Sequence, residues 1–156
     1  MLTLEAATRL SQEIEREGRR LVFTNGVFDL LHKGHVRYLT AARSLGDVLV
    51  VGVNSDRSVR AIKGPGRPVV PEAERAEVLA SLAAVDAVVV FDEDTPHRLI
   101  AALQPAVLVK GADWGETEII GRDVVEAGGG TVVRLPLEAG CSTTSIVERI
   151  RSGRLT

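Results

Sequence analysis

Apolar residues follow two patterns along the chain, and the two patterns alternate. Short uninterrupted aliphatic runs are typical of buried strands, whereas apolar residues spaced three or four apart are typical of amphipathic helices. The uninterrupted runs predict five strands, over residues 21–24, 47–53, 86–91, 106–109 and 131–135. The wider spacing predicts helices over residues 4–16, 35–45, 72–82, 96–103, 116–127 and 143–150.

Strands that alternate with helices indicate an α/β fold, with one open, mostly parallel five-stranded sheet flanked by helices. We expect a single domain over residues 1–156, with an N-terminal helix inside residues 1–20 and the core over 21–150. Ligands bind such sheets beyond the carboxyl ends of the strands. The segments that follow strands are therefore the candidate binding loops: 25–34, 54–68, 110–115 and 136–144.

The composition of the chain supports this fold and narrows the function. Of 156 residues, 45% are hydrophobic but only 3% are aromatic, so the core must be aliphatic, as in a buried parallel sheet. The formal net charge of −2 argues against a strongly basic face, and we expect no nucleic acid partner. No apolar run approaches about 18 residues, so no membrane span is expected. A single cysteine, Cys141, excludes an internal disulfide and fits the reducing cytoplasm.

The loop after the first strand contains two of the three histidines. His32 and His35 are three residues apart at a predicted helix start, so they can share one face. Free N–H groups at a helix start attract phosphate, and Gly26 and Gly34 leave room for a bulky anion. The alternatives are ordinary helix-start residues or a chance metal pair. No third histidine or cysteine lies nearby in the sequence, so we expect no metal site.

Residues 26–35 read Gly-Val-Phe-Asp-Leu-Leu-His-Lys-Gly-His, and this segment resembles the HxGH signature of the cytidylyltransferase-like nucleotidyltransferases. The fuller resemblance is to the adenylyltransferase domain of heptose-phosphate enzymes. It rests on further motifs that occur in the family's order: Asn54-Ser-Asp56, Lys63-Gly-x-x-Arg-Pro68, Glu74-Arg75, Val85-Asp86, Lys110-Gly-Ala-Asp-Trp114 and Ser142-Thr-Thr144. The resemblance implies a Rossmann-like HxGH nucleotidyltransferase fold.

The resemblance also implies a reaction and a set of site residues. An oxygen of a sugar phosphate attacks the α-phosphorus of ATP, pyrophosphate leaves, and Mg²⁺ bridges phosphate oxygens. Catalysis is assigned to His32, His35 and Lys63. Nucleotide binding is assigned to Asn25, Gly26, Val27, Phe28, Gly34, Arg75, Lys110, Gly111, Ser142, Thr143 and Thr144. Substrate binding is assigned to Asp29, Asn54, Asp56, Arg67, Asp113 and Trp114.

Some of the charged residues in this set have a plainer alternative role. Lys63 and Arg67 flank a Gly-Pro-Gly sequence that predicts an irregular loop, which is either a basic flap over phosphates or a solvated surface loop. Arg75 could instead form a surface salt bridge, which contributes little stability. Asp29 could instead orient the loop by accepting hydrogen bonds from backbone N–H groups, or be an ordinary turn residue.

The remaining alternatives concern capping and packing. Asp56 could cap the next helix, and this is the role we expect for it rather than substrate binding. Trp114 could pack in the core, although its place at a strand end favours the pocket. The hydroxyls of residues 142–144 could cap the last helix while a neighbouring hydroxyl faces the ligand.

Leu137 bears on the choice of nucleotide. Cytidylyltransferases for glycerol phosphate have an arginine at this place, so the sequence favours the heptose branch. The expected function is transfer of AMP from ATP to D-glycero-D-manno-heptose 1-phosphate, giving ADP-heptose and pyrophosphate. One alternative is a cytidylyltransferase for glycerol 3-phosphate or another alcohol phosphate. An alternative of another class is a non-catalytic nucleotide-binding or dimerisation module.

The resemblance implies partners as well. By analogy with relatives we expect a homodimer whose interface lies near Val85-Asp86. The related bifunctional enzymes carry a sugar kinase domain in front, and only 20 residues precede the first predicted strand here. We therefore expect a separate sugar kinase, and a cytoplasmic location for both reactions.

Overall fold

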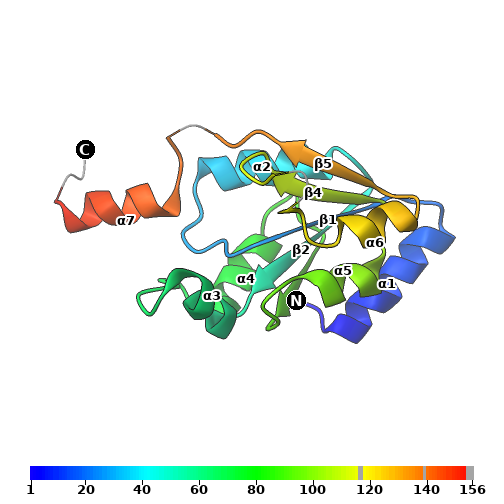
Figure 1. Cartoon of the computed structure of the whole chain (residues 1–156), viewed down its shortest axis with the longest axis horizontal. Coiled ribbons are helices and arrows are strands. Elements are labelled where there is room, and N and C mark those ends of the chain that lie inside the picture. The colour runs from blue at the N-terminus through cyan, green and yellow to red at the C-terminus, as the bar shows by residue number, and fades with distance from the viewer. Residues whose placement is uncertain (116–117, 139, 154–156) are drawn as a thin grey trace.

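The computed structural model describes residues 1–115, 118–138 and 140–153, and its strands form one five-stranded sheet (Figure 1). The strands are β1 Leu21–Gly26, β2 Val48–Asn54, β3 Ala87–Phe91, β4 Val107–Gly111 and β5 Thr131–Leu135. Their order is β3-β2-β1-β4-β5, and every neighbouring pair is parallel. The predicted α/β class with an open, five-stranded sheet is confirmed.

The helices either pack on the two faces of the sheet or, at the C-terminal end of the chain, extend away from it (Figure 1). They are α1 Leu4–Arg16, α2 Lys33–Arg43, α3 Asp56–Lys63, α4 Glu72–Ala80, α5 His97–Leu103, α6 Arg122–Ala127 and α7 Thr143–Arg151. In the described parts of the chain, no helix has both the length and the apolar character that crossing a bilayer requires.

The strands β1 and β4 are neighbours at the centre of the sheet although β2 and β3 separate them in the sequence. The chain adds β2 and β3 on one side of β1, and then returns to add β4 and β5 on the other side. Such a change of direction opens a crevice at the carboxyl ends of the two central strands, which is where ligands bind in open α/β sheets.

Two apolar clusters cover the two faces of the sheet. Side chains point alternately to opposite faces along a strand. Phe23 and Leu108 therefore pack with α1, α5 and α6, whereas Val22 and Val109 pack with α2 and α4. Burying each such side chain contributes about 1.5–3 kcal/mol. This packing fixes which face the polar side chains at the strand ends occupy.

The N-terminal segment is part of this packing. Ala7 and Ile14 of α1 are buried in the same cluster as Phe23. Thr3 caps α1, because its hydroxyl accepts a hydrogen bond from the Ala6 N–H at 3.2 Å. A single domain over residues 1–156 remains a prediction.

The structure corrects the sequence prediction between residues 54 and 68. The helix α3 occupies Asp56–Lys63, where we expected only irregular chain. Ser55 caps it, because its hydroxyl accepts a hydrogen bond from the Ser58 N–H at 3.1 Å. The predicted cap, Asp56, is instead the first helical residue. The Gly-Pro-Gly sequence begins only after the helix has ended at Lys63.

Three other helix starts also differ from prediction. The helix α2 begins at Lys33 instead of residue 35. The helix α5 begins at His97, one residue after the predicted start, with Pro96 at the cap position and no side-chain cap. The helix α6 begins at Arg122 instead of residue 116, and residues 116–117 lie outside the described residues. Gly121 precedes α6 with a φ of +86°, a left-handed conformation that suits glycine and turns the chain into the helix.

Candidate functional site

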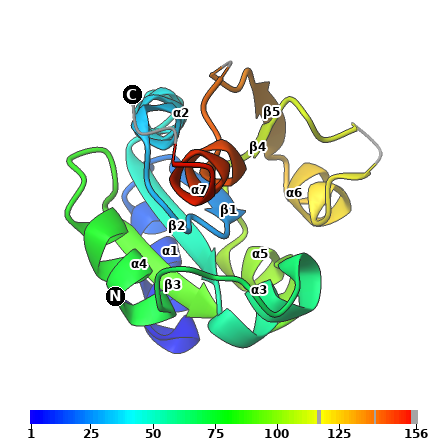
Figure 2. The same cartoon turned by 90° about the vertical axis from the view of Figure 1, so that its left-hand side faces the viewer.

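A cavity of about 560 Å³ lies at the carboxyl ends of the central strands. All four predicted binding loops contribute to its walls, together with side chains from α2 and α3. Figure 2 views the molecule from the side where α7 projects, with α2 and the central strands behind that helix. All the predicted site residues line the cavity except Asp56 and Arg75.

His32 and His35 form a stacked pair at the start of α2. Their ring centroids are 3.9 Å apart, and the ring planes differ by 20°. The Nδ1 atoms of both rings are buried, and neither has a hydrogen-bond partner within residues 1–115, 118–138 and 140–153. Burial lowers the pKa of both rings, and with the neighbouring His32 it brings that of His35 to about 4. Near pH 7 both imidazoles are therefore neutral, and their N–H groups can donate hydrogen bonds to an anion.

Phe28 and Gly34 hold the histidine pair in place. The Phe28 ring meets that of His35 edge to face, with centroids 5.4 Å apart. Phe28 has a φ of +46°, a conformation that strains a bulky residue by about 1–3 kcal/mol. A Cβ at Gly34 would lie 3.0 Å from the His32 ring and 3.1 Å from the Cβ of Cys141. The segment before α7 therefore packs directly against the turn that carries the histidines.

Lys110 reaches the same cavity from β4. Only 6% of the residue is exposed, and its ammonium donates a hydrogen bond to the amide oxygen of Asn25 at the end of β1. Its Nζ also lies 5.8 Å from the centroid of the Trp114 ring, within the range of a cation–π contact. Burial lowers the pKa of this ammonium to about 8, so it remains mostly charged near pH 7.

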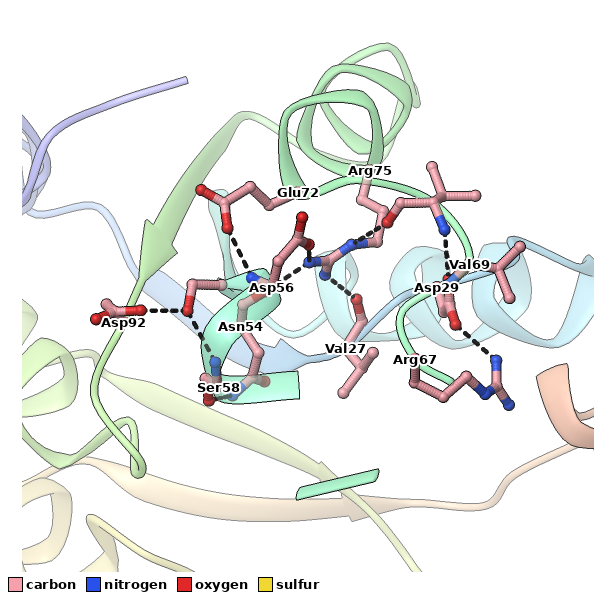
Figure 3. Close-up of polar contacts among 12 residues, drawn as sticks. Val27, Asp29, Asn54, Asp56, Ser58, Arg67, Val69, Glu72, Arg75 and Asp92 are labelled. Atoms are coloured by element: carbon pink, nitrogen blue, oxygen red, sulfur yellow. Dashed lines mark hydrogen bonds and ion pairs between the residues drawn. The ribbon is translucent and has the colours of Figure 1, made fainter. Parts of the chain in front are cut away.

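Asp29 is buried beneath the segment that follows α3 (Figure 3). Its Oδ2 accepts a hydrogen bond from the Arg67 guanidinium at 2.6 Å. Its Oδ1 accepts hydrogen bonds from the N–H groups of Val69 and Val70 at 2.8 and 3.0 Å. The carboxylate thus joins the loop after β1 to the segment after α3, and both of its oxygens are engaged within the protein.

Arg75 is the centre of a second set of internal contacts, and only 1% of it is exposed. Its guanidinium donates to the carbonyl oxygens of Val27, Asn54 and Val70 and to the carboxylate of Asp56 (Figure 3). All three guanidinium nitrogens therefore have protein partners, and a surface salt bridge is the wrong description. The structure does not bring this residue to the cavity, where a nucleotide would meet it.

Asp56 and Asn54 join neighbouring elements. The carboxylate of Asp56 lies 2.7 Å from the guanidinium of Arg75. The backbone N–H of Asp56 donates a hydrogen bond to the Glu72 carboxylate at 2.6 Å. Asn54 does line the cavity, but its amide group donates to the Ser58 hydroxyl at 3.0 Å. These contacts connect β2 with α3 and α4, and only Asn54 remains placed to meet a substrate.

Lys63 and the start of α7 complete the polar wall. Lys63 is exposed at the last residue of α3 and lines the cavity. Ser142 caps α7, because its hydroxyl accepts from the Ser145 N–H at 3.0 Å, as predicted for this segment. Thr143 donates to the Leu30 carbonyl at 3.4 Å. The N-terminus of α7 adds partial positive charge beside the cavity.

Tyr38 is a cavity residue that sequence analysis missed. Its hydroxyl shares a hydrogen bond of 2.8 Å with Thr24, and burial raises the pKa of Tyr38 to about 12. It lies three residues after His35 in one helix, and that spacing would have identified it.

An apolar wall faces the polar residues of the cavity. It is formed by Ile62, Trp114, Ile120 and Leu137, each of which is partly exposed. A core position for Trp114 is excluded, because 46% of the residue is exposed. A wall of this kind suits the flat apolar faces of a nucleobase.

The described part of the chain contains no group of three or more His, Cys, Asp or Glu side chains that could hold a metal ion. The carboxylates that line the cavity are those of Asp29, Asp94, Asp113 and Glu138, and they do not form such a group. A divalent cation here would therefore depend mainly on oxygens that a phosphate ligand brings with it.

Comparison with curated proteins gives relatives of high identity. The chain is 55% identical over 152 residues to the Bifunctional protein HldE of Geotalea uraniireducens, covering 97% of this chain and 31% of that protein. It is 54% identical over 154 residues to the Bifunctional protein HldE of Bradyrhizobium diazoefficiens, with the same coverage of 97% and 31%. The chain thus spans less than a third of the length of these relatives.

Solved structures and a family model agree with this relationship. The crystal structure of a lipopolysaccharide core biosynthesis protein from Thermoplasma volcanium has a TM-score of 0.64 and 30% identity, covering 78% of this chain and 98% of that one. A protein with unknown function from Archaeoglobus fulgidus shares the fold, with a TM-score of 0.61, 24% identity and coverage of 79% and 93%. The family model described as Cytidylyltransferase-like matches residues 23–149, a range that includes the histidine pair and all the residues that line the cavity. As the HxGH signature predicted, the chain belongs to the cytidylyltransferase-like family of nucleotidyltransferases.

Proposed function

We propose that the protein transfers AMP from ATP to D-glycero-D-manno-heptose 1-phosphate and releases ADP-heptose and pyrophosphate. The observation that carries this proposal is the stacked pair of neutral histidines at the start of α2. Both rings line the cavity, and neither Nδ1 atom has a hydrogen-bond partner among the described residues. The resemblance of the ordered motifs to the heptose branch supports the choice of acceptor.

The reaction requires positioning and charge stabilisation more than proton transfer. The second pKa of a phosphate monoester is about 6, so the acceptor phosphate is already ionised near pH 7 and needs no general base. One of its oxygens attacks the α-phosphorus of ATP. The bond from that phosphorus to the oxygen bridging to the β-phosphate breaks, and pyrophosphate leaves with the electron pair. Negative charge grows on the bridging oxygen during this step.

The polar wall contains the groups that would stabilise this charge. The N–H groups of His32 and His35 and the N-terminus of α2 donate to the phosphate oxygens, and Lys63 adds a full positive charge. Mg²⁺, when bound with ATP, would neutralise further phosphate oxygens. The apolar wall, with Ile120 and Leu137, would take the adenine ring.

The proposal extends to partners and location. The acceptor is a phosphate ester, and we propose that a separate sugar kinase acts before this enzyme to supply its phosphate group. We also propose a homodimer with Val85-Asp86 near its interface, and a cytoplasmic enzyme. Analytical ultracentrifugation tests the dimer, because a sedimentation coefficient of a 16.7 kDa monomer at micromolar concentration would contradict it.

Pyrophosphate release by the purified protein tests the reaction. ATP and CTP are each offered with D-glycero-D-manno-heptose 1-phosphate and with glycerol 3-phosphate. We expect release with ATP and the heptose phosphate, and a product with the mass of ADP-heptose. A preference for CTP and glycerol 3-phosphate would replace the proposal with a cytidylyltransferase. No release from any of the four pairs would remove the proposed reaction.

A further inference from the structure

We propose that Lys110 binds the phosphate of the acceptor substrate, and that the cavity therefore has two separate anion-binding positions on opposite faces of the sheet. This inference rests on the proposed function, since it assigns one of the two substrates to a particular part of the same cavity. It also revises the nucleotide-binding role that the sequence suggested for this residue.

The first argument is the electrostatic state of Lys110. Only 6% of the residue is exposed, and its ammonium donates a hydrogen bond to the neutral amide oxygen of Asn25. Within the described ranges no carboxylate forms an ion pair with it. Holding a charge in a buried position without a counter-ion is costly, and an anionic ligand would offset that cost. Because Lys110 lines the cavity, a bound ligand can supply this anion.

The second argument is the face of the sheet on which Lys110 lies. Leu108 packs with α1, α5 and α6, and Val109 packs on the opposite face with α2. Lys110 is two residues after Leu108, so its side chain leaves β4 on the face away from α2. Asn25 leaves β1 on that same face, because it follows Phe23 by two residues.

The histidine pair approaches from the other face. His32 and His35 belong to the start of α2, the helix that packs against Val22 and Val109. The cavity thus receives hydrogen-bond donors from the α2 face and a full positive charge from the opposite face. Both groups line the same cavity.

The chemistry of the transfer explains why two positions are needed. In an in-line displacement the attacking and leaving oxygens lie on opposite sides of the phosphorus. If the triphosphate occupies the α2 face beside the histidines, then the attacking phosphate must enter from the other side of the α-phosphorus. Lys110 lies on the face opposite α2 and would supply a cation there. It would hold the acceptor phosphate while one oxygen remains directed at ATP.

The variant Lys110→Met tests this assignment, because methionine retains the apolar stem and removes the charge. A charge-assisted hydrogen bond contributes about 1.5–3 kcal/mol, so we expect the KM for the heptose phosphate to rise about 10- to 100-fold. The dissociation constant of ATP, measured by calorimetry, should change less than about twofold. Arg9→Met, which removes one exposed charge on α1, is the matched control and should change neither value.

Two results would overturn the assignment. A rise in the ATP dissociation constant with an unchanged KM for the heptose phosphate would place Lys110 at the nucleotide. Unchanged values of both, with a lower melting temperature, would make it a structural residue that positions Asn25.

A binding experiment separates this inference from the proposed reaction. Inorganic phosphate is titrated by calorimetry into protein saturated with the non-hydrolysable analogue α,β-methylene-ATP. The wild-type protein should bind phosphate, and Lys110→Met should bind it at least 10-fold more weakly. Equal phosphate binding, or no binding by the wild type, overturns the Lys110 assignment whether or not turnover is observed. No turnover together with Lys110-dependent phosphate binding overturns only the proposed reaction.

Discussion

Two groups of charged and polar residues from the family motifs differ in where their hydrogen bonds and ion pairs are made. The paired cluster, formed by Asp29, Asp56, Arg67 and Arg75, makes its hydrogen bonds and ion pairs within the protein. The open cluster, formed by His32, His35, Lys63 and Lys110, borders the cavity with bonding capacity that a ligand could use. A charged residue in a family motif can therefore serve the scaffold, and its partners in space decide which role it has.

The largest effect should come from breaking the paired cluster at Arg75. In Arg75→Met the Asp56 carboxylate and three backbone carbonyl oxygens lose their donor. Removing one partner of a buried ion pair costs about 3–5 kcal/mol, so the free energy of unfolding should fall by that amount in urea denaturation. Arg98→Met is the control, since the Arg98–Glu93 pair is exposed and worth about 0–1 kcal/mol.

The opposite result at Arg75 would reverse the comparison. If Arg75→Met were as stable as Arg98→Met but bound ATP at least 10-fold more weakly, the guanidinium would be a nucleotide ligand, as the sequence first suggested. The internal contacts would then describe only the ligand-free protein.

The open cluster should respond more in kinetics than in stability. Replacing His35 by alanine removes a donor to the phosphates, and losing one such contact costs about 10²–10³-fold in kcat. The melting temperature should fall only by what the lost ring contacts with His32 and Phe28 contribute, since the Nδ1 atom has no hydrogen-bond partner to lose among the described residues. His97→Ala, at the exposed start of α5, is the matched control for both measurements. Normal turnover in His35→Ala would make this histidine structural.

The sequence was sufficient for the sheet and for the position of the cavity. Five aliphatic runs gave five strands, because a strand buried on both faces excludes polar residues. The HxGH motif was also readable, since its glycine and histidines are adjacent in sequence. Helix α3 was missed because the nearby Gly-Pro-Gly sequence obscured a helix that Ser55 starts and Lys63 ends.

The role of individual charged residues could not be read in the same way. Asp29 finds its partners about 40 residues further along the chain, at Arg67, Val69 and Val70. Arg75 donates hydrogen bonds to backbone carbonyl groups from three separate segments. Every residue has a backbone carbonyl group, so the sequence does not indicate which of them will bind an arginine. Lys110 shows the converse, because only the fold reveals that it is buried beside a neutral amide.

A smaller effect is expected where the two clusters adjoin. Asp29→Asn keeps the shape of the side chain but removes the charge that holds Arg67. Hydrogen bonds to a charged group contribute about 1.5–3 kcal/mol, so stability should fall by up to that amount in urea denaturation. The kcat should fall a few-fold, because the segment after Lys63 is held less firmly. If only the KM for the heptose phosphate rose, at unchanged stability, Asp29 would be a substrate ligand.

The last prediction concerns the pH dependence of stability, and it tests whether His35 is neutral in the folded protein. Burial lowers its pKa to about 4, whereas a histidine in the unfolded chain has a pKa near its ordinary value of about 6.5. Below that value the unfolded state binds a proton that the folded state does not. The stability contributed by the neutral ring is therefore present above about pH 6.5 and is lost as the pH falls toward 4.

His35→Gln lacks this titration, so its free energy of unfolding should fall less than that of the wild type between pH 7 and 4.5. Carboxylates titrate in both proteins, and the difference between the two urea-denaturation curves isolates His35. Parallel curves would mean that His35 is protonated as easily in the folded protein as in the unfolded chain, and the open cluster would then present a cation to phosphate instead of a neutral donor.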